Sequence, residues 1–165
     1  MTSTRDGFVP TPIPNPGIRF PPPLIYVAGL VAGWGLQRMR PLTLPDGLGV
    51  VRVVLAAACI VAWLLLMLWA FATFHRAHTA IKPFRPARSI VTNGPYRITR
   101  NPMYVSMTAL YLGITLLINS WWPLLLLLIV LFVIRRFVIA REERYLTDAF
   151  PVEYAAYCQR VRRWL

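Results

Sequence analysis

Two short polar segments hold most of the residue types that can do chemistry in this chain. The first reads Gly94-Pro95-Tyr96-Arg97-Ile98-Thr99-Arg100-Asn101-Pro102-Met103-Tyr104, and the second, later in the chain, reads Arg141-Glu142-Glu143-Arg144. Each segment adjoins a long hydrophobic run. Arginine binds carboxylates and phosphates through charge-assisted hydrogen bonds, and carboxylates accept hydrogen bonds from hydroxyl and amino groups. The two segments therefore predict a polar binding site at the edge of an apolar bundle.

Carboxylates are scarce in this chain, and most of them come late in it. Of the six acidic residues, the last four are Glu142, Glu143, Asp148 and Glu153. A carboxylate that binds a ligand or acts as a base is therefore expected among these four. Glu143 and Arg136 are seven residues apart, which puts them on one helix face. A helix end held by salt bridges to Arg100, Arg136 or Arg144 explains the same pattern without any site, so both interpretations stay open.

Arg100-Asn101-Pro102 is also typical of a helix start. Asn101 is a favourable N-cap residue, and Pro102 fits the first turn of a helix. A helix start presents free backbone N–H groups, which bind anions well. With Arg100 beside it, the same three residues predict a site for a carboxylate as well as a helix cap.

The composition of the chain indicates a membrane protein. The chain has 165 residues, of which 57% are hydrophobic, and a net charge of +12. The basic residues, all arginine except Lys82, lie at the ends of apolar runs, as expected for anchoring to anionic lipid headgroups. We therefore expect no nucleic-acid binding. Cys59 and Cys158 indicate no disulfide, and His75 and His78 lack the companions of a metal site, so we expect no metal.

Four apolar runs predict an all-α, polytopic membrane bundle of about four transmembrane helices. They cover about residues 24–39, 50–74, 103–118 and 121–140, against the roughly 20 residues that cross a bilayer. Gly29, Gly33 and Gly35 give the first helix a face that a neighbouring helix can approach closely. Residues 1–23 carry seven of the fifteen prolines and are expected to be extended. We expect residues 24–165 to form one domain.

The last part of the chain predicts a C-terminal amphipathic helix at the membrane interface. Its aromatic stripe consists of Phe150, Tyr154 and Tyr157, ahead of the basic residues Arg160, Arg162 and Arg163. The loop of residues 75–101 and this last segment are strongly basic, whereas the turn of residues 119–123 has no charge. The positive-inside rule then places both termini in the cytoplasm, and we expect the inner membrane of a bacterium.

Residues 90–165 resemble the superfamily of membrane methyltransferases that contains the isoprenylcysteine carboxyl methyltransferases and the phospholipid methyltransferases. The matching elements are Asn93-Gly94-Pro95-Tyr96, Arg100-Asn101-Pro102-Met103-Tyr104, Glu142-Glu143, Leu146, Phe150, Tyr154, Tyr157 and Val161-Arg162-Arg163-Trp164. The resemblance implies S-adenosylmethionine as the methyl donor. It also implies a cofactor pocket at the cytoplasmic face, formed by residues 90–165.

The resemblance also implies roles for single residues. Arg100 is expected to hold the carboxylate of the methyl donor, and Glu142 or Glu143 to accept from its ribose hydroxyls or amino group. The rings of Tyr96, Tyr104 or Tyr154 suit the sulfonium cation. We assign catalytic roles to Arg100, Asn101 and Glu143. The cofactor-binding set contains these three and Gly94, Pro95, Tyr96, Pro102, Tyr104, Glu142, Tyr154 and Tyr157.

The sequence departs from the superfamily at a few positions. Asn101 stands where many members have histidine, and asparagine cannot titrate, so we do not expect a general base there. Ser106 and Pro151 each replace a glycine, which we interpret as adjustments of packing. The acceptor is expected to be lipophilic: a prenyl-thioether carboxylate, a phospholipid amine or a small hydrophobic molecule. Because an amine must be neutral to attack, the lack of a histidine base favours a carboxylate or another easily ionised group.

Two other functions fit part of the pattern. Sterol and steroid reductases have a distantly similar C-terminal region and use NADPH, but they are generally longer. A lipid-binding or assembly subunit without catalytic activity is the other alternative. Asn101 leaves this alternative open, whereas the presence of Arg100 and both glutamates argues against it. The oligomeric state does not follow from the sequence.

Overall fold

The computed structural model of the chain describes residues 21–45, 47, 49–76 and 90–165. Most of the predicted proline-rich segment and residues 77–89 of the predicted basic loop lie outside the described residues. The described residues are mostly helical, with one isolated β-bridge between Thr99 and Arg162. The prediction of an all-α fold is confirmed for this part of the chain.

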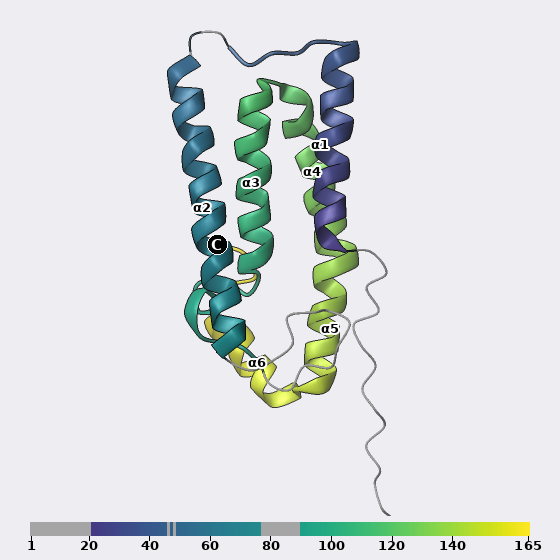
Figure 1. The fold of residues 1–165 in the computed structure, drawn as a ribbon. Helices are drawn as coiled ribbons and strands as arrows, with labels where there is room; N and C mark the ends of the chain where they lie inside the picture. The colour runs from purple at the N-terminus through teal and green to yellow at the C-terminus, as the bar shows by residue number, and fades with distance from the viewer. Residues whose placement is uncertain (1–20, 46, 48, 77–89) are drawn as a thin grey trace, which may run out of the picture.

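Four helices run side by side along the molecule (Figure 1). They are α1 (Pro22–Met39), α2 (Gly49–Arg76), α3 (Pro102–Ile118) and α4 (Trp121–Val133). The first three begin and end within two residues of the apolar runs at 24–39, 50–74 and 103–118. The reason is local: prolines occupy the first turn of α1 and of α3, where a missing N–H costs nothing. A left-handed residue, Asn119 with φ 58°, ends α3.

Four shorter elements gather at the lower end of the bundle in Figure 1. The helix that starts with α4 continues without a break into the π-helix η3 (Ile134–Ile139) and then into α5 (Ala140–Ala149). α6 (Pro151–Arg160) follows after a bend at Phe150. The 3₁₀-helix η2 (Gly94–Arg97) precedes α3. α6 is a helix in the expected segment, and the amphipathic helix on a membrane surface remains a prediction.

α1 packs closely against α4 through two glycines. A Cβ atom on Gly33 would lie 2.7 Å from the Cα atom of Pro123, and one on Gly29 would lie 2.6 Å from Val130 Cγ2. Gly35, in contrast, has no atom within 4 Å of such a Cβ position. The predicted small-residue face is therefore used by Gly29 and Gly33 but not by Gly35.

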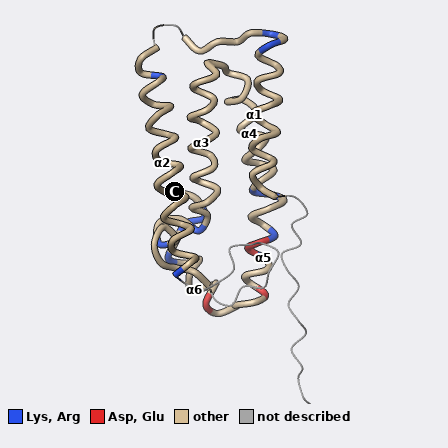
Figure 2. The backbone as a smooth tube through the Cα atoms, in the orientation of Figure 1, with Lys and Arg blue, Asp and Glu red and all other residues tan. Residues whose placement is uncertain are grey.

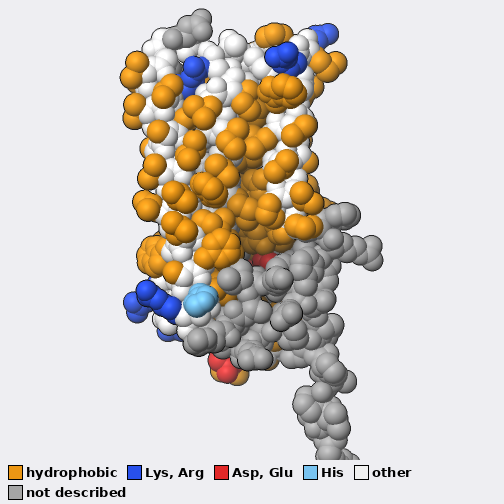
Figure 3. Space-filling model, in the orientation of Figure 1, with side chains coloured by type: hydrophobic (Ala, Val, Ile, Leu, Met, Phe, Trp, Pro, Cys, Tyr) orange, Lys and Arg blue, Asp and Glu red, His pale blue; other side chains and the backbone are white. Residues whose placement is uncertain are grey.

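The outside of the bundle is that of a membrane protein. α2 and the continuous helix from Trp121 to Ala149 are long and apolar enough to cross a membrane. Apolar side chains cover the surface of the bundle over most of its length (Figure 3), and Leu65 and Phe132 each expose 63% of their surface. Soluble proteins rarely expose so large an apolar surface. α3 has 17 residues, and membrane crossing by α1 and α3 remains a prediction.

The charged residues lie at the two ends of the bundle (Figure 2). In the described chain the acidic residues occupy only the lower end, on α5 and α6. Glu142 comes 21 residues after Trp121, which is roughly 30 Å of helix at 1.5 Å per residue. A bilayer's hydrocarbon core is about 30 Å thick. Glu142 therefore lies about one hydrocarbon-core thickness along the helix from Trp121, and its position at a membrane interface remains a prediction.

Candidate functional site

The two predicted polar segments meet at the lower end of the bundle. The stretch between η2 and α3 runs beside the segment that follows α6, where Arg100 N donates to Arg162 O over 2.9 Å. α5 approaches the same place from the other side (Figure 1). Residues from η2, α3, α5, α6 and the segment of residues 161–165 therefore surround one region.

Arg100 occupies the centre of this region. Its Nη1 atom lies 3.3 Å from Glu143 Oε1 and donates to Cys158 Sγ over 2.7 Å. Its Nε atom is buried and has no hydrogen-bond partner among the residues that the structure describes. A buried N–H group without a partner costs free energy, so this face of the guanidinium suits an incoming acceptor. The expected proximity of Arg100 to the glutamates is observed.

Glu143 is fully engaged by arginines. Arg163 donates from Nε to Glu143 Oε1 over 2.9 Å and from Nη2 to Glu143 Oε2 over 2.7 Å. This is the two-pronged geometry that makes arginine–carboxylate pairs strong. The ion-pair partners of Glu143 are thus Arg163 and Arg100, whereas Arg136, on the same predicted helix face, is exposed in η3.

Glu142 has a different environment. Tyr104 donates from its hydroxyl to Glu142 Oε1 over 2.9 Å. Burial raises the pKa of Glu142 to about 7; the hydrogen bond from Tyr104 opposes this rise, and the charge of Glu143 adds to it. In the described part of the chain, its carboxylate is not within ion-pair distance of an arginine. Of the two adjacent glutamates, Glu142 is therefore the one without an ion pair among the described residues.

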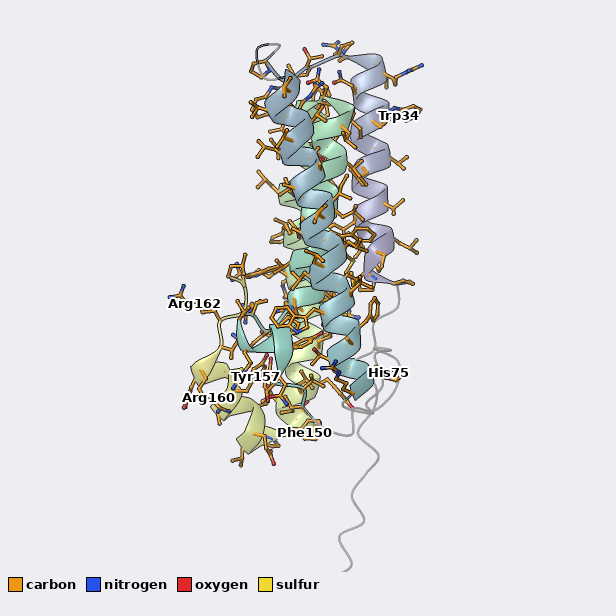
Figure 4. All side chains as sticks on the ribbon, turned by 60° about the vertical axis from the view of Figure 1, so that its left-hand side comes forward. Trp34, His75, Phe150, Tyr157, Arg160 and Arg162 are labelled. Carbon is orange, nitrogen blue, oxygen red and sulfur yellow. The ribbon has the colours of Figure 1, made fainter. Side chains whose placement is uncertain are left out.

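The tyrosines of α6 face the protein interior. Tyr154 and Tyr157 are buried in a cluster with Tyr96 and Ala70, and the Tyr157 hydroxyl donates to Tyr96 O over 2.7 Å. In Figure 4 Tyr157 lies on the side of α6 that faces the bundle, whereas Arg160 and Arg162 lie at its outer edge. Burial raises the pKa of Tyr154, and the neighbouring Arg100 opposes that shift. Tyr157 thus fixes η2, and Tyr154 lies beside Arg100.

Gly94 and Pro95 position η2 against α2. Gly94 has a φ of 61°, and a Cβ atom there would collide with the side chain of Thr73 on α2. Pro95 is fully buried. The ring of Tyr96 packs edge-on against Phe74 with ring centroids 5.3 Å apart. The expected cofactor-binding residues Gly94 and Pro95 therefore act on the site by holding Tyr96 in place.

Asn101 is the N-cap residue of α3, as predicted, but its side chain does not do the capping. The Asn101 side chain makes no capping hydrogen bond to α3; instead its Nδ2 atom donates to Arg163 O over 2.8 Å. The backbone carbonyl of Asn101 accepts the first bonds of α3, from Tyr104 N and Val105 N, each over 3.0 Å. Pro102 is buried at the first turn, as expected. Competition from the carbonyl of Arg163 explains why the amide turns away from the helix.

Arg163, Thr99 and Cys158 were not among the predicted site residues. Thr99 is buried, and its hydroxyl donates to Arg163 O over 3.2 Å. Arg163 is twenty residues from Glu143 in the chain and beyond the bend at Phe150, so helical spacing carries no signal for the pair. Among the described residues there is no group of three or more metal-ligating side chains.

Above this site, the surface between α1 and α2 is recessed. The recess is lined with apolar side chains over its visible length (Figure 3). An acidic side chain shows at its lower end, at the level where α5 begins (Figures 2 and 3). A polar site and a membrane-exposed apolar recess therefore adjoin.

Comparison with known proteins identifies the chain's relatives. The family model described as phospholipid methyltransferase matches residues 51–153, more than half of the chain. An uncharacterized protein of Haemophilus influenzae is 44% identical over 63 residues, which are 38% of this chain and all of the relative. No solved structure matches. Because the family model covers α2, α3, α4, α5 and both polar segments, this chain belongs to the phospholipid methyltransferase family.

Proposed function

We propose that this chain transfers a methyl group from S-adenosylmethionine to a lipophilic acceptor at the membrane interface. One observation supports it most: the Arg100–Glu143 ion pair and the Tyr104–Glu142 hydrogen bond lie where α5 begins, the level at which an acidic side chain shows at the end of an apolar recess (Figure 3). Such a site offers polar groups to a charged methyl donor and an apolar surface to an acceptor dissolved in the bilayer. Membership of a methyltransferase family supports methyl transfer in general.

The polar groups of the site fit the proposed methyl donor. The unpartnered Nε atom of Arg100 suits its carboxylate. Glu142, which pairs with no arginine in the described chain, suits its ribose hydroxyls or its amino group. Tyr96 and Tyr154, both buried beside these groups, suit a sulfonium cation through their ring faces.

Bound in this way, the donor would supply an electrophilic methyl group. Transfer of a methyl group is an in-line displacement that depends on alignment and on exclusion of water. Arg100 and Glu142 would fix the direction of the donor, and the apolar recess would admit the acceptor from the membrane. The fit holds for a prenyl-thioether carboxylate, a phospholipid amine or a small hydrophobic molecule.

Calorimetric titration of the purified protein with S-adenosylhomocysteine and with NADPH tests the proposal. We expect binding of S-adenosylhomocysteine and none of NADPH. Binding of NADPH alone would replace methyl transfer with the reductase function. Binding of neither ligand, with vesicle lipids still bound, would support the non-catalytic alternative.

A further inference from the structure

Arg163, which is outside the set of site residues predicted from the sequence, contacts three residues of the site. Its guanidinium binds both carboxylate oxygens of Glu143, over 2.9 and 2.7 Å. Its backbone carbonyl accepts from Asn101 Nδ2 over 2.8 Å and from Thr99 Oγ1 over 3.2 Å. Arg163 thus connects the stretch before α3 with α5.

The geometry around Glu143 is unequal for its two arginines. Arg163 takes the two-pronged arrangement, whereas Arg100 reaches Glu143 Oε1 only through Nη1 at 3.3 Å. The Nε atom of Arg100 stays buried and unpartnered as a result. Two guanidinium groups and one carboxylate leave one uncompensated positive charge, and it lies on the side of Arg100.

We propose that Arg163 is a positioning residue, which occupies Glu143 so that Arg100 stays available for the carboxylate of the methyl donor. This inference rests on the proposed function. Without the Arg163 side chain, Glu143 would be the nearest carboxylate to Arg100, and a two-pronged pair between them would form. The site would then carry no net charge from these groups, and the donor carboxylate would have to compete with Glu143.

The test compares two ligands that differ only in that carboxylate. They are S-adenosylhomocysteine and its decarboxylated form, S-adenosyl-3-thiopropylamine. In the wild-type protein we expect S-adenosylhomocysteine to bind at least about tenfold more tightly, as for one charge-assisted contact. In Arg163→Gln the affinity for S-adenosylhomocysteine falls about tenfold, and the affinity for the decarboxylated ligand is unchanged.

Arg160→Gln is the matched control. It removes the same charge three residues earlier, from an exposed side chain that donates to Ala156 O in its own helix. We expect Arg160→Gln to keep the wild-type ratio of the two affinities. A general effect of net charge would lower that ratio in both variants and would overturn the inference.

A double variant tests whether Arg163 acts through Glu143. Glu143→Gln removes the competing carboxylate, so adding Arg163→Gln to it should leave the ratio of affinities unchanged. If Arg163→Gln does not fold, Arg163→Lys, which keeps the charge but not the two-pronged geometry, should lower the ratio by a smaller factor. If the ratio of affinities were lower in the double variant than in Glu143→Gln alone, Arg163 would act by a route other than Glu143.

The outcomes separate this inference from the proposed function. A wild-type protein that binds neither ligand would contradict the proposed function. One that binds both equally would contradict the role of Arg100, and with it this inference, but not the proposed function. A wild-type preference that Arg163→Gln retains in full would overturn only the role of Arg163. Equal loss of both ligands in Arg163→Gln would make Arg163 a purely structural residue.

Discussion

Glu142 and Glu143 are neighbours in the chain but point in different directions, since successive residues of an α-helix are about 100° apart. Glu143 reaches Arg163 and Arg100, whereas Glu142 reaches the hydroxyl of Tyr104. Glu143 has two arginines beside it. Burial raises the pKa of Glu142. The two residues are therefore expected to differ in function.

The affinity for S-adenosylhomocysteine should rise with pH through about 7, the pKa of Glu142. Only the ionised carboxylate accepts hydrogen bonds with both oxygens. The groups that face Glu142 are the hydroxyls of Tyr104 and Tyr96 and the charge of Glu143, and the tyrosines keep their protons in this range. Titration at about pH 6 and about pH 8 measures the effect, which Glu142→Gln should abolish.

Protonation of Glu142 should also affect stability, and the sign follows from its raised pKa. Between its ordinary 4.5 and about 7, the folded protein holds a proton that the unfolded chain has released. The contribution of Glu142 to stability is therefore present at low pH and is lost as the pH rises through this window.

The affinity prediction has its own control. If Glu142→Gln kept the full pH dependence of the affinity for S-adenosylhomocysteine, another group would be responsible for that dependence.

Arg100→Ala should weaken binding of S-adenosylhomocysteine by about ten- to a hundredfold, as for the loss of one charge-assisted hydrogen bond. The fold should persist, because Glu143 keeps its two bonds to Arg163. Arg97→Ala is the control, since Arg97 is an exposed arginine of η2. Calorimetry on both variants measures the difference. Equal affinities would mean that Arg100 only forms an ion pair at the interface.

At the scale of elements, Gly33→Ala should destabilise the bundle, while Gly35→Ala should not. Both changes gain the same helix propensity, about 1 kcal/mol. Only the new methyl group at position 33 meets the backbone of Pro123, at 2.7 Å, and overpacking of this kind costs about 1–3 kcal/mol. Thermal unfolding in detergent compares the two variants. Equal melting temperatures would contradict the close contact between α1 and α4.

The helices could be predicted from the sequence because their signals are local. Apolar runs and first-turn prolines, such as Pro102, fixed the bounds of α1, α2 and α3 to within two residues. The contacts of the site depend on long-range packing. No spacing rule connects Glu143 to Arg163 across the bend at Phe150. The bond from Asn101 Nδ2 to the backbone carbonyl of Arg163 could not be predicted for the same reason.

At the scale of the whole molecule, we propose four membrane spans with both ends of the chain in the cytoplasm. The described acidic residues and the proposed site lie at one end of the bundle, and the uncharged turn of residues 119–123 lies at the other (Figure 2). The positive-inside rule assigns the strongly basic end to the cytoplasm. The proposed donor would then reach the site from the cytoplasm.

Cysteine labelling in sealed cells tests this orientation. In a background without Cys59 and Cys158, a cysteine at Asn119 should react with a membrane-impermeant reagent added outside. A cysteine at Asn93, which is exposed near the site, should react only after the cells are opened. Labelling of position 93 from outside would reverse the proposed topology, and labelling of both positions from outside would contradict four spans.

The π-helix η3, between α4 and α5, has a consequence for reading related sequences. A π-turn takes in one residue more than an α-turn, and one residue amounts to about 100° of rotation in an α-helix. η3 therefore takes up one extra residue between α4 and α5. Deleting one residue from positions 134–139 should give a regular α-helix that still directs Glu142 and Glu143 toward Tyr104 and Arg163. In a relative with an uninterrupted α-helix, the glutamate pair should therefore follow its apolar run one residue sooner.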